Sequence, residues 1–185
     1  MSNKRYSVIY ADPPWDYKGQ TQHRKNGKPS GGAITHYPTM KLDELKKLDV
    51  QSLADDDCLL FMWVTSPHLN QAIELMSALG FKYATIAFIW DKMKTNPGFY
   101  TLSEFEICIV GKKGKIPKPR GLRNVRQRIV EKRTAHSAKP AEARNRIDLM
   151  FPTQQKIELF ARSIPPGWDA WGNQINSTIQ VGTLP

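Results

Sequence analysis

A doubly wound α/β fold, in which helices cover both faces of a mostly parallel sheet, is predicted from the order of apolar segments along the chain. Short apolar runs alternate with stretches of helical periodicity, and the sequence has no internal repeat. The run Cys58–Val64 is apolar at every position, which is typical of a strand covered on both faces. The predicted strands are Tyr6–Tyr10, Cys58–Val64, Tyr83–Trp90, Phe105–Val110, Lys156–Phe160 and Trp168–Trp171.

Three helices are expected between these strands. Ser66 and Pro67 form an N-cap followed by proline at the first helical position, and apolar residues recur at helical spacing from there to Gly80. The other two helices are expected over Lys41–Leu53 and Pro140–Phe151.

The length of 185 residues favours one domain over residues 1–185 with a sizeable core. Two long segments, about 18–37 and 112–136, interrupt the alternation. Loops of this length in a compact domain are functional or disordered. We interpret both as mobile walls of a substrate cleft, and plain disorder is the alternative for the first.

Several classes of protein are disfavoured. Cys58 and Cys108 lie in apolar runs, without the spacing of a disulfide framework or a zinc site. The sequence shows no secretory signal, and no apolar run approaches the roughly 18 residues of a membrane span. We therefore expect a cytoplasmic protein without a metal and without a membrane partner.

The net charge of +10 is concentrated in one segment. Between Lys112 and Arg133 there are ten Lys or Arg residues and one acidic residue, Glu131. Glycine and proline separate the charges, which indicates an irregular arm that follows a phosphate backbone, although a solvated surface loop is the alternative. The candidate contacts are Lys112, Lys113, Lys115, Lys118, Arg120 and Arg123.

The most informative motif is Asp12-Pro13-Pro14-Trp15, directly after the first predicted strand. Strand carboxyl ends are where open α/β sheets bind ligands. The Asp12 carboxylate and the Pro13 carbonyl would each accept a hydrogen from an amine conjugated to an aromatic ring, such as the six-amino group of adenine, and so favour its methylation. Proline locks this geometry, and Trp15 would pack on the base. The alternative is a strand capped by prolines, with a core tryptophan.

With these residues in view, the chain resembles the MT-A70-like family of adenine methyltransferases, from about residue 6 to residue 175. The order and spacing of several motifs carry the resemblance. They are Ala11–Trp15, His36–Met40, Leu60–Val64, Cys108–Gly111, His136–Pro140, Lys156–Arg162, Gly167-Trp168 and Trp171–Gln174.

The resemblance implies a Rossmann-like methyltransferase fold with a permuted order, in which the catalytic motif comes first, and S-adenosylmethionine as the cofactor. It assigns Lys139 to the cofactor's carboxylate, Arg162 and Gln174 to its ribose and Asn173 to its adenine. Glu158 is expected to support Arg162. The strand that leads to Arg162 should then lie beside the strand that leads to Asp12.

Two further positions follow from the same resemblance. Tyr37, next to His36, would stack on the target adenine or cover the cofactor, and packing on the Lys41 helix is the alternative. His136 would contact phosphate or cofactor, or be a structural histidine. The family's messenger-RNA enzyme has a His-Asn pair after its arginine and an upstream segment on the cofactor's adenine. Here Ser163 follows Arg162 and few residues precede Asp12, so we expect modest cofactor affinity.

The resulting expectation is a site-specific, S-adenosylmethionine-dependent DNA adenine methyltransferase of the bacterial or phage kind. Its partner would be DNA, single-stranded or with a flipped base, and a homodimer is expected. RNA is the less favoured substrate. An inactive nucleic-acid-binding partner subunit and a protein-glutamine methyltransferase are the alternatives, but the intact Asp12 argues against the first. Enzymes of the second kind use Asn-Pro-Pro-Tyr.

Overall fold

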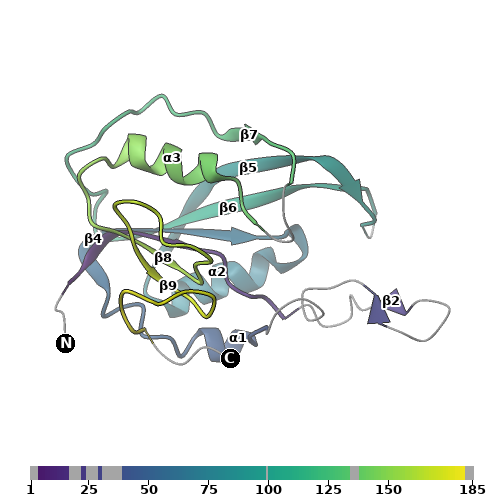
Figure 1. Ribbon diagram of the computed structural model, residues 1–185, viewed down its shortest axis with the longest axis horizontal. Helices are drawn as coiled ribbons and strands as arrows, with labels where there is room; N and C mark the ends of the chain where they lie inside the picture. Colours follow the sequence, from purple (N-terminus) through teal and green to yellow (C-terminus); the bar gives the residue numbers. More distant parts are fainter. Residues whose placement is uncertain are drawn as a thin grey trace.

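The computed structural model describes residues 4–16, 22–23, 29–30, 39–98, 100–133 and 138–181. Its main sheet has seven strands in the order β7-β5-β6-β4-β1-β8-β9 (Figure 1). The strands are β1 Tyr6–Ala11, β4 Ala54–Val64, β5 Lys82–Asn96, β6 Ser103–Lys113, β7 Arg128–Val130, β8 Lys156–Leu159 and β9 Asp169–Trp171. The helices are α1 Leu42–Leu45, α2 Leu69–Ala78 and α3 Ala141–Met150, with a 3₁₀ turn, η2, at Ser66–His68.

The sheet is mostly parallel, as predicted. Strands β4, β1, β8 and β9 pair in parallel, and β7 is parallel to β5. Strand β6 is antiparallel to both of its neighbours and alone runs against the rest of this sheet. The chain leaves β1 for β4 on one side and returns to β8 on the other. The carboxyl end of β1 is therefore a topological switch point, where such sheets form ligand crevices.

Helices cover both faces, with α1 and α2 on one side and α3 on the other (Figure 1). Side chains of β4 alternate between these layers, as the uniformly apolar run predicts. Leu60 and Met62 join the core cluster under α2, whereas Phe61 and Trp63 join the cluster under α3. Burying each such side chain contributes about 1.5–3 kcal/mol, so the double layer holds the strand ends in place.

The helix predicted over Lys41–Leu53 is wrong in length, because α1 ends at Leu45. The backbone beyond it bonds in three-residue steps, as in Lys47 N–H to Glu44 at 3.2 Å. Asp49 then accepts the Ser52 N–H at 3.2 Å, a local turn that competes with the helix. The expected N-cap at Ser66 is also displaced, since Thr65 is the N-cap of η2, which precedes α2.

Strands β5 and β6 are longer than predicted, and they pair with each other as an antiparallel hairpin. Lys112 and Lys113 consequently belong to β6 and not to an irregular arm. Within the arm, β7 pairs with β5. In the first long segment, β2 Gln22–His23 and β3 Pro29–Ser30 pair as a small antiparallel sheet.

Candidate active site at the carboxyl end of the first strand

Asp12, the first residue after β1, belongs to a chain of ion pairs. Its Oδ2 lies 2.8 Å from Lys139 Nζ, and Lys139 Nζ lies 3.3 Å from Glu106 Oε2. Glu106 Oε1 lies 3.5 Å from Nζ of Lys92, whose side chain is buried. Two carboxylates and two ammonium groups therefore alternate, so the buried charges compensate one another.

The two carboxylates are shifted in opposite directions. Burial raises the pKa of Asp12 above its usual value, and it outweighs the lowering by the Lys139 ammonium. Burial also acts to raise the pKa of Glu106, but Lys139 and Lys92 together overcome it and hold that pKa below the usual value. Asp12 is therefore the better proton acceptor of the two, and Glu106 is a fixed negative charge.

Lys139 stands immediately before α3, whose N-cap is Pro140. Its ammonium lies 6.0 Å from the ring centroid of Trp63, and the indole N–H of Trp63 donates to the Tyr10 hydroxyl at 2.6 Å. The N-terminus of a helix favours an anion at this place. The sequence analysis assigns Asp12 to catalysis and Lys139 to the cofactor. In the structure, these two side chains form an ion pair with each other.

The backbone of Pro13 and Pro14 is fixed by hydrogen bonds. The Pro13 carbonyl accepts the Trp15 N–H at 2.8 Å, and the Pro14 carbonyl accepts the Met40 N–H at 2.8 Å. A carbonyl oxygen has two lone pairs, so the bond from Trp15 orients the Pro13 oxygen without exhausting its capacity as an acceptor.

Trp15 does not present a face to a ligand in this structure. It is 4 % exposed, and its indole N–H donates to the Trp63 carbonyl at 3.2 Å. Its ring stacks on His68 with centroids 6.3 Å apart. The packing supports the alternative of a core tryptophan, because a large apolar ring with one donor is fully satisfied inside the core.

The chain after β8 makes a sharp turn. Phe160 has a φ of 60°, a left-handed conformation that is uncommon outside glycine. The Ala161 N–H donates to the Trp171 carbonyl at 2.9 Å, and a Cβ at Gly172 would collide with the Ala161 carbonyl oxygen. These contacts seat the turn after β8 against the turn after β9.

This seating brings three predicted cofactor residues to one end of the sheet. Asn173 and Gln174 are exposed in the turn after β9, and Arg162 is exposed in the turn after β8. The Arg162 charge is near enough to Asp12 to lower its pKa, in opposition to burial. The prediction that the Arg162 region lies beside the Asp12 strand is confirmed, since β8 pairs with β1.

Glu158 has a partner other than the expected one. It lies opposite Tyr10 in the β1–β8 register, and its Oε2 is 2.7 Å from Arg144 Nη1 of α3. Burial raises the pKa of Glu158 above its usual value, against the lowering by Arg144. In the described structure its ion pair therefore ties β8 to α3 and is made with Arg144, not with Arg162.

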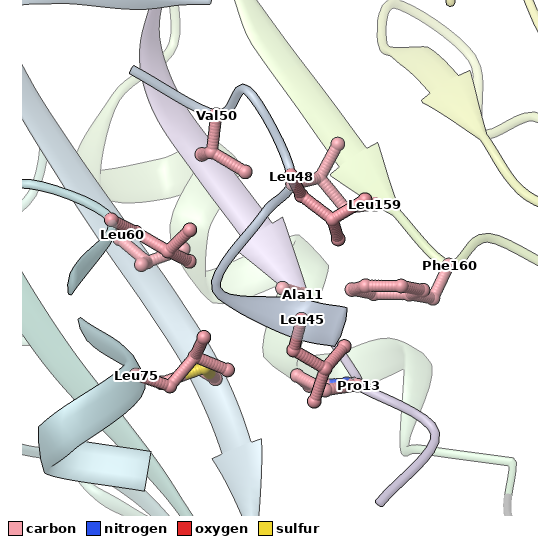
Figure 2. A pocket seen from close by; sticks show the side chains of 11 residues that line it. Ala11, Pro13, Leu45, Leu48, Val50, Leu60, Leu75, Leu159 and Phe160 are labelled. Atoms are coloured by element: carbon pink, nitrogen blue, oxygen red, sulfur yellow. The ribbon is translucent and has the colours of Figure 1, made fainter. Parts of the chain in front are cut away.

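An apolar pocket adjoins the site on the α2 face of the sheet. Figure 2 shows Pro13, Leu45 and Phe160 around it, with the Phe160 ring pointing toward Ala11. All of its lining residues are apolar. Because Pro13 is in its wall, this small pocket begins where the Asp12 motif ends, and most of its lining residues belong to the buried core.

The first part of the basic arm, residues 112–123, lies at the opposite end of the strands from Asp12. Lys113 pairs with Cys58 near the start of β4, whereas Ala11, next to Asp12, pairs with Met62 near its end. In Figure 1 the arm crosses the upper left of the view, while β1 runs toward the right.

The arm also packs against the far end of α3. The Arg120 guanidinium lies 5.0 Å from the Phe151 ring centroid, and the Gly121 N–H donates to the Met150 carbonyl at 2.9 Å. The interpretation of this segment as a wall of the cleft at Asp12 is therefore wrong for residues 112–123. The exposed cations there include Lys112, Lys115, Lys118 and Arg123.

Tyr37, His36 and His136 lie outside the described residues. Within the described ranges, no group of three or more His, Cys, Asp or Glu side chains is arranged to hold a metal ion. No helix in that part of the chain is long and apolar enough to cross a membrane.

Sequence reasoning missed Glu106, Lys92 and the role of Trp63. The sequence does contain a sign of Glu106, because it is a charged residue inside the apolar strand predicted at Phe105–Val110 and so indicates a buried, paired charge. Charged side chains are almost never buried unless they are paired. The partner, however, comes from a segment 33 residues away, and spacing along the chain does not reveal it.

Fold and site together define a Rossmann-like methyltransferase, with a carboxylate at the switch point of a mostly parallel sheet. The MT-A70 family model matches residues 6–174. The chain therefore belongs to the MT-A70 family, which confirms the resemblance found in the sequence.

Individual relatives cover the chain to different extents. It is 49 % identical to "Type II methyltransferase M.MunI" of Mycoplasma sp, over 99 % of this chain and 84 % of that protein. It is 30 % identical to "N(6)-adenosine-methyltransferase catalytic subunit METTL3" of Homo sapiens, over 93 % of this chain and 28 % of that protein. It is 27 % identical to "N(6)-adenine-specific methyltransferase METTL4" of Mus musculus, over 93 % of this chain and 38 % of that protein.

Proposed function

We propose that the chain transfers a methyl group from S-adenosylmethionine to the exocyclic six-amino group of adenine in DNA. The observation that carries the proposal is the Asp12 carboxylate, held at the switch point by Lys139 beside the fixed Pro13 carbonyl. The relative named as a type II methyltransferase, which aligns with almost the whole chain, favours DNA.

The amine of adenine is a weak nucleophile, because its lone pair is delocalised into the ring. Asp12 accepts one amine hydrogen and the Pro13 carbonyl accepts the other, so the lone pair is directed away from the ring. The raised pKa of Asp12 also suits it to take the proton that the amine must lose. Acceptors fixed before the reaction lower the barrier by about 3 kcal/mol.

The residues around Asp12 fit a cofactor with both negative and positive groups. S-adenosylmethionine supplies an electrophilic methyl group on a sulfonium. Lys139, at the N-terminus of α3, would hold the carboxylate, while Arg162, Asn173 and Gln174 would hold the nucleoside. The apolar wall formed by Pro13 and Phe160 would exclude water from one side.

DNA-binding residues and assembly complete the proposal. Tyr37 is proposed to close over the target base. The exposed cations of residues 112–123, at the far end of the strands from Asp12, are proposed to contact the phosphate backbone away from the target. In a homodimer, the second copy of this small domain would also contact the duplex.

The test is transfer of labelled methyl from S-adenosylmethionine to double-stranded DNA, single-stranded DNA and RNA of matched sequence, followed by nucleoside analysis. We expect N6-methyladenine in DNA and none with Asp12→Ala. Methylation of RNA alone would instead support an RNA enzyme. Tight nucleic-acid binding without transfer to any polymer would support an inactive partner subunit.

A further inference from the structure

The tip of the β5–β6 hairpin exposes large apolar side chains. Tyr100 is fully exposed, and the exposed fractions of Met93 and Leu102 are 65 % and 62 %. Figure 1 shows this ribbon extending beyond the central strands on the side where β1 ends. Apolar groups grouped on a projecting element mark an interaction surface more often than singly scattered ones do.

The hairpin is joined directly to the Asp12 site. Trp90 pairs with Glu106 across its two strands, and Glu106 is the ion-pair partner of Lys139, which holds Asp12. On β6, Ser103 lies three residues before Glu106, which places it roughly 10 Å along the strand toward the tip. The apolar tip is therefore within a few nucleotide lengths of the carboxylate.

Local contacts shape the described backbone that leads into the tip. The register shifts between Asp91 and Asn96, so β5 bulges on this side. Within the bulge Met93 has a φ of 52°, and its N–H donates to Asp91 Oδ1 at 3.0 Å. A Cβ at Gly98 would collide with the Thr101 carbonyl oxygen, so the backbone at Gly98 lies close to that of Thr101. Strain of this kind is retained where the conformation has a use.

More cations than acidic residues lie beside the apolar tip. Lys94 is exposed on the bulge, whereas the acidic Glu104 is exposed on β6 two residues from Leu102. The Glu131 N–H donates to the Asp91 carbonyl at 3.2 Å, so Lys132 and Arg133 follow beside the base of the hairpin. An apolar tip with positive charge beside it suits a polyanion with stacked rings better than a protein surface of mixed charge.

We propose that the hairpin tip is a wedge that enters the DNA duplex beside the target adenine, with Tyr100 and Leu102 against the bases next to the vacated position. This inference rests on the function proposed above. A paired adenine must leave the stack before its amine reaches Asp12, and this unstacking is costly. Apolar side chains inserted at the opened step offset that cost.

The experiment measures kcat/KM on two duplexes. One carries a sequence that the wild-type enzyme methylates in plasmid DNA, and the other carries the same sequence with a mismatch opposite the target adenine. The variants are Tyr100→Ala and Leu102→Ala. Leu149→Ala is the control, because Leu149 is 50 % exposed but lies near the C-terminal end of α3, away from the hairpin.

On the matched duplex, each hairpin variant should lower kcat/KM by about tenfold, as the loss of one stacking contact does. On the mismatched duplex, where the base is already loose, the loss should be about twofold or less. The control should act like the wild type on both. Equal losses on both duplexes, or no loss on either, would overturn the wedge.

The failure of each proposal is distinguishable. If the wild type methylates no adenine in DNA, the proposed function fails and the wedge fails with it. If Tyr100→Ala methylates DNA normally but changes the oligomeric state of the protein, as measured by its molecular mass in solution, the tip is a protein interface instead.

Discussion

Lys139 Nζ lies 2.8 Å from Asp12 Oδ2 and bridges it to Glu106. The ammonium expected to meet the cofactor's carboxylate is thus bonded directly to the carboxylate expected to accept the amine hydrogen. Binding of an anion at Lys139 would weaken its hold on Asp12 and leave that carboxylate a stronger acceptor. The ion-pair chain therefore couples the two ends of the proposed site.

The first prediction concerns pH. Because the pKa of Asp12 is raised, protonation removes the acceptor as the pH falls, and the acid limb of kcat/KM should lie above that of an ordinary aspartate. The Glu106 charge contributes to this rise, so Glu106→Gln should move the limb to lower pH. A pH–rate profile of both proteins measures the shift. A limb that moves upward or stays in place would assign it to another group.

A second prediction separates cofactor binding from fold. Lys139→Gln should weaken S-adenosylmethionine binding by roughly ten- to a hundredfold, because a charge-assisted hydrogen bond is lost. Calorimetric titration of the cofactor measures it, with Lys115→Gln at the opposite end of the strands as the matched control. Unchanged affinity in the Lys139 variant would mean that this lysine serves only to position Asp12.

A third prediction tests whether Trp15 is a core residue. Trp15→Phe removes the indole N–H bond to the Trp63 carbonyl, so the free energy of unfolding should fall by about 1–3 kcal/mol. Urea denaturation measures this loss. If Trp15 stacked on the target base instead, stability would be unchanged and the KM for DNA would rise.

Features that depend on neighbouring residues in the sequence were predicted, whereas features that depend on contacts between distant segments were not. The strand β1, the Asp12 motif and the layers above and below β4 follow from local patterns, and the structure has them. The β5–β6 hairpin was missed because no glycine-rich two-residue turn marks it, and its strands pair through a bulged register. Lys92, Glu106 and the burial of Trp15 depend on contacts between distant segments, which periodicity does not encode.

A fourth prediction concerns the arm. Replacing Lys115, Lys118 and Arg123 together by Gln should weaken duplex binding and reduce the slope of log affinity against log salt by about one for each lost phosphate contact. Turnover at saturating DNA should not change, since these residues lie at the opposite end of the strands from Asp12. Binding titrations at several salt concentrations measure the slope. An unchanged slope would mean that the arm does not meet phosphate.

The most direct test of the central claim is single-turnover methyl transfer by Asp12→Asn, with cofactor binding measured on the same protein. Asp16→Asn, four residues further along, is the matched control. Asn keeps the size of Asp12 but not the carboxylate, so transfer should fall by about two to three orders of magnitude while cofactor affinity stays within a few-fold of the wild type. Transfer at near the wild-type rate would show that the Asp12 carboxylate is not the acceptor and would contradict the account.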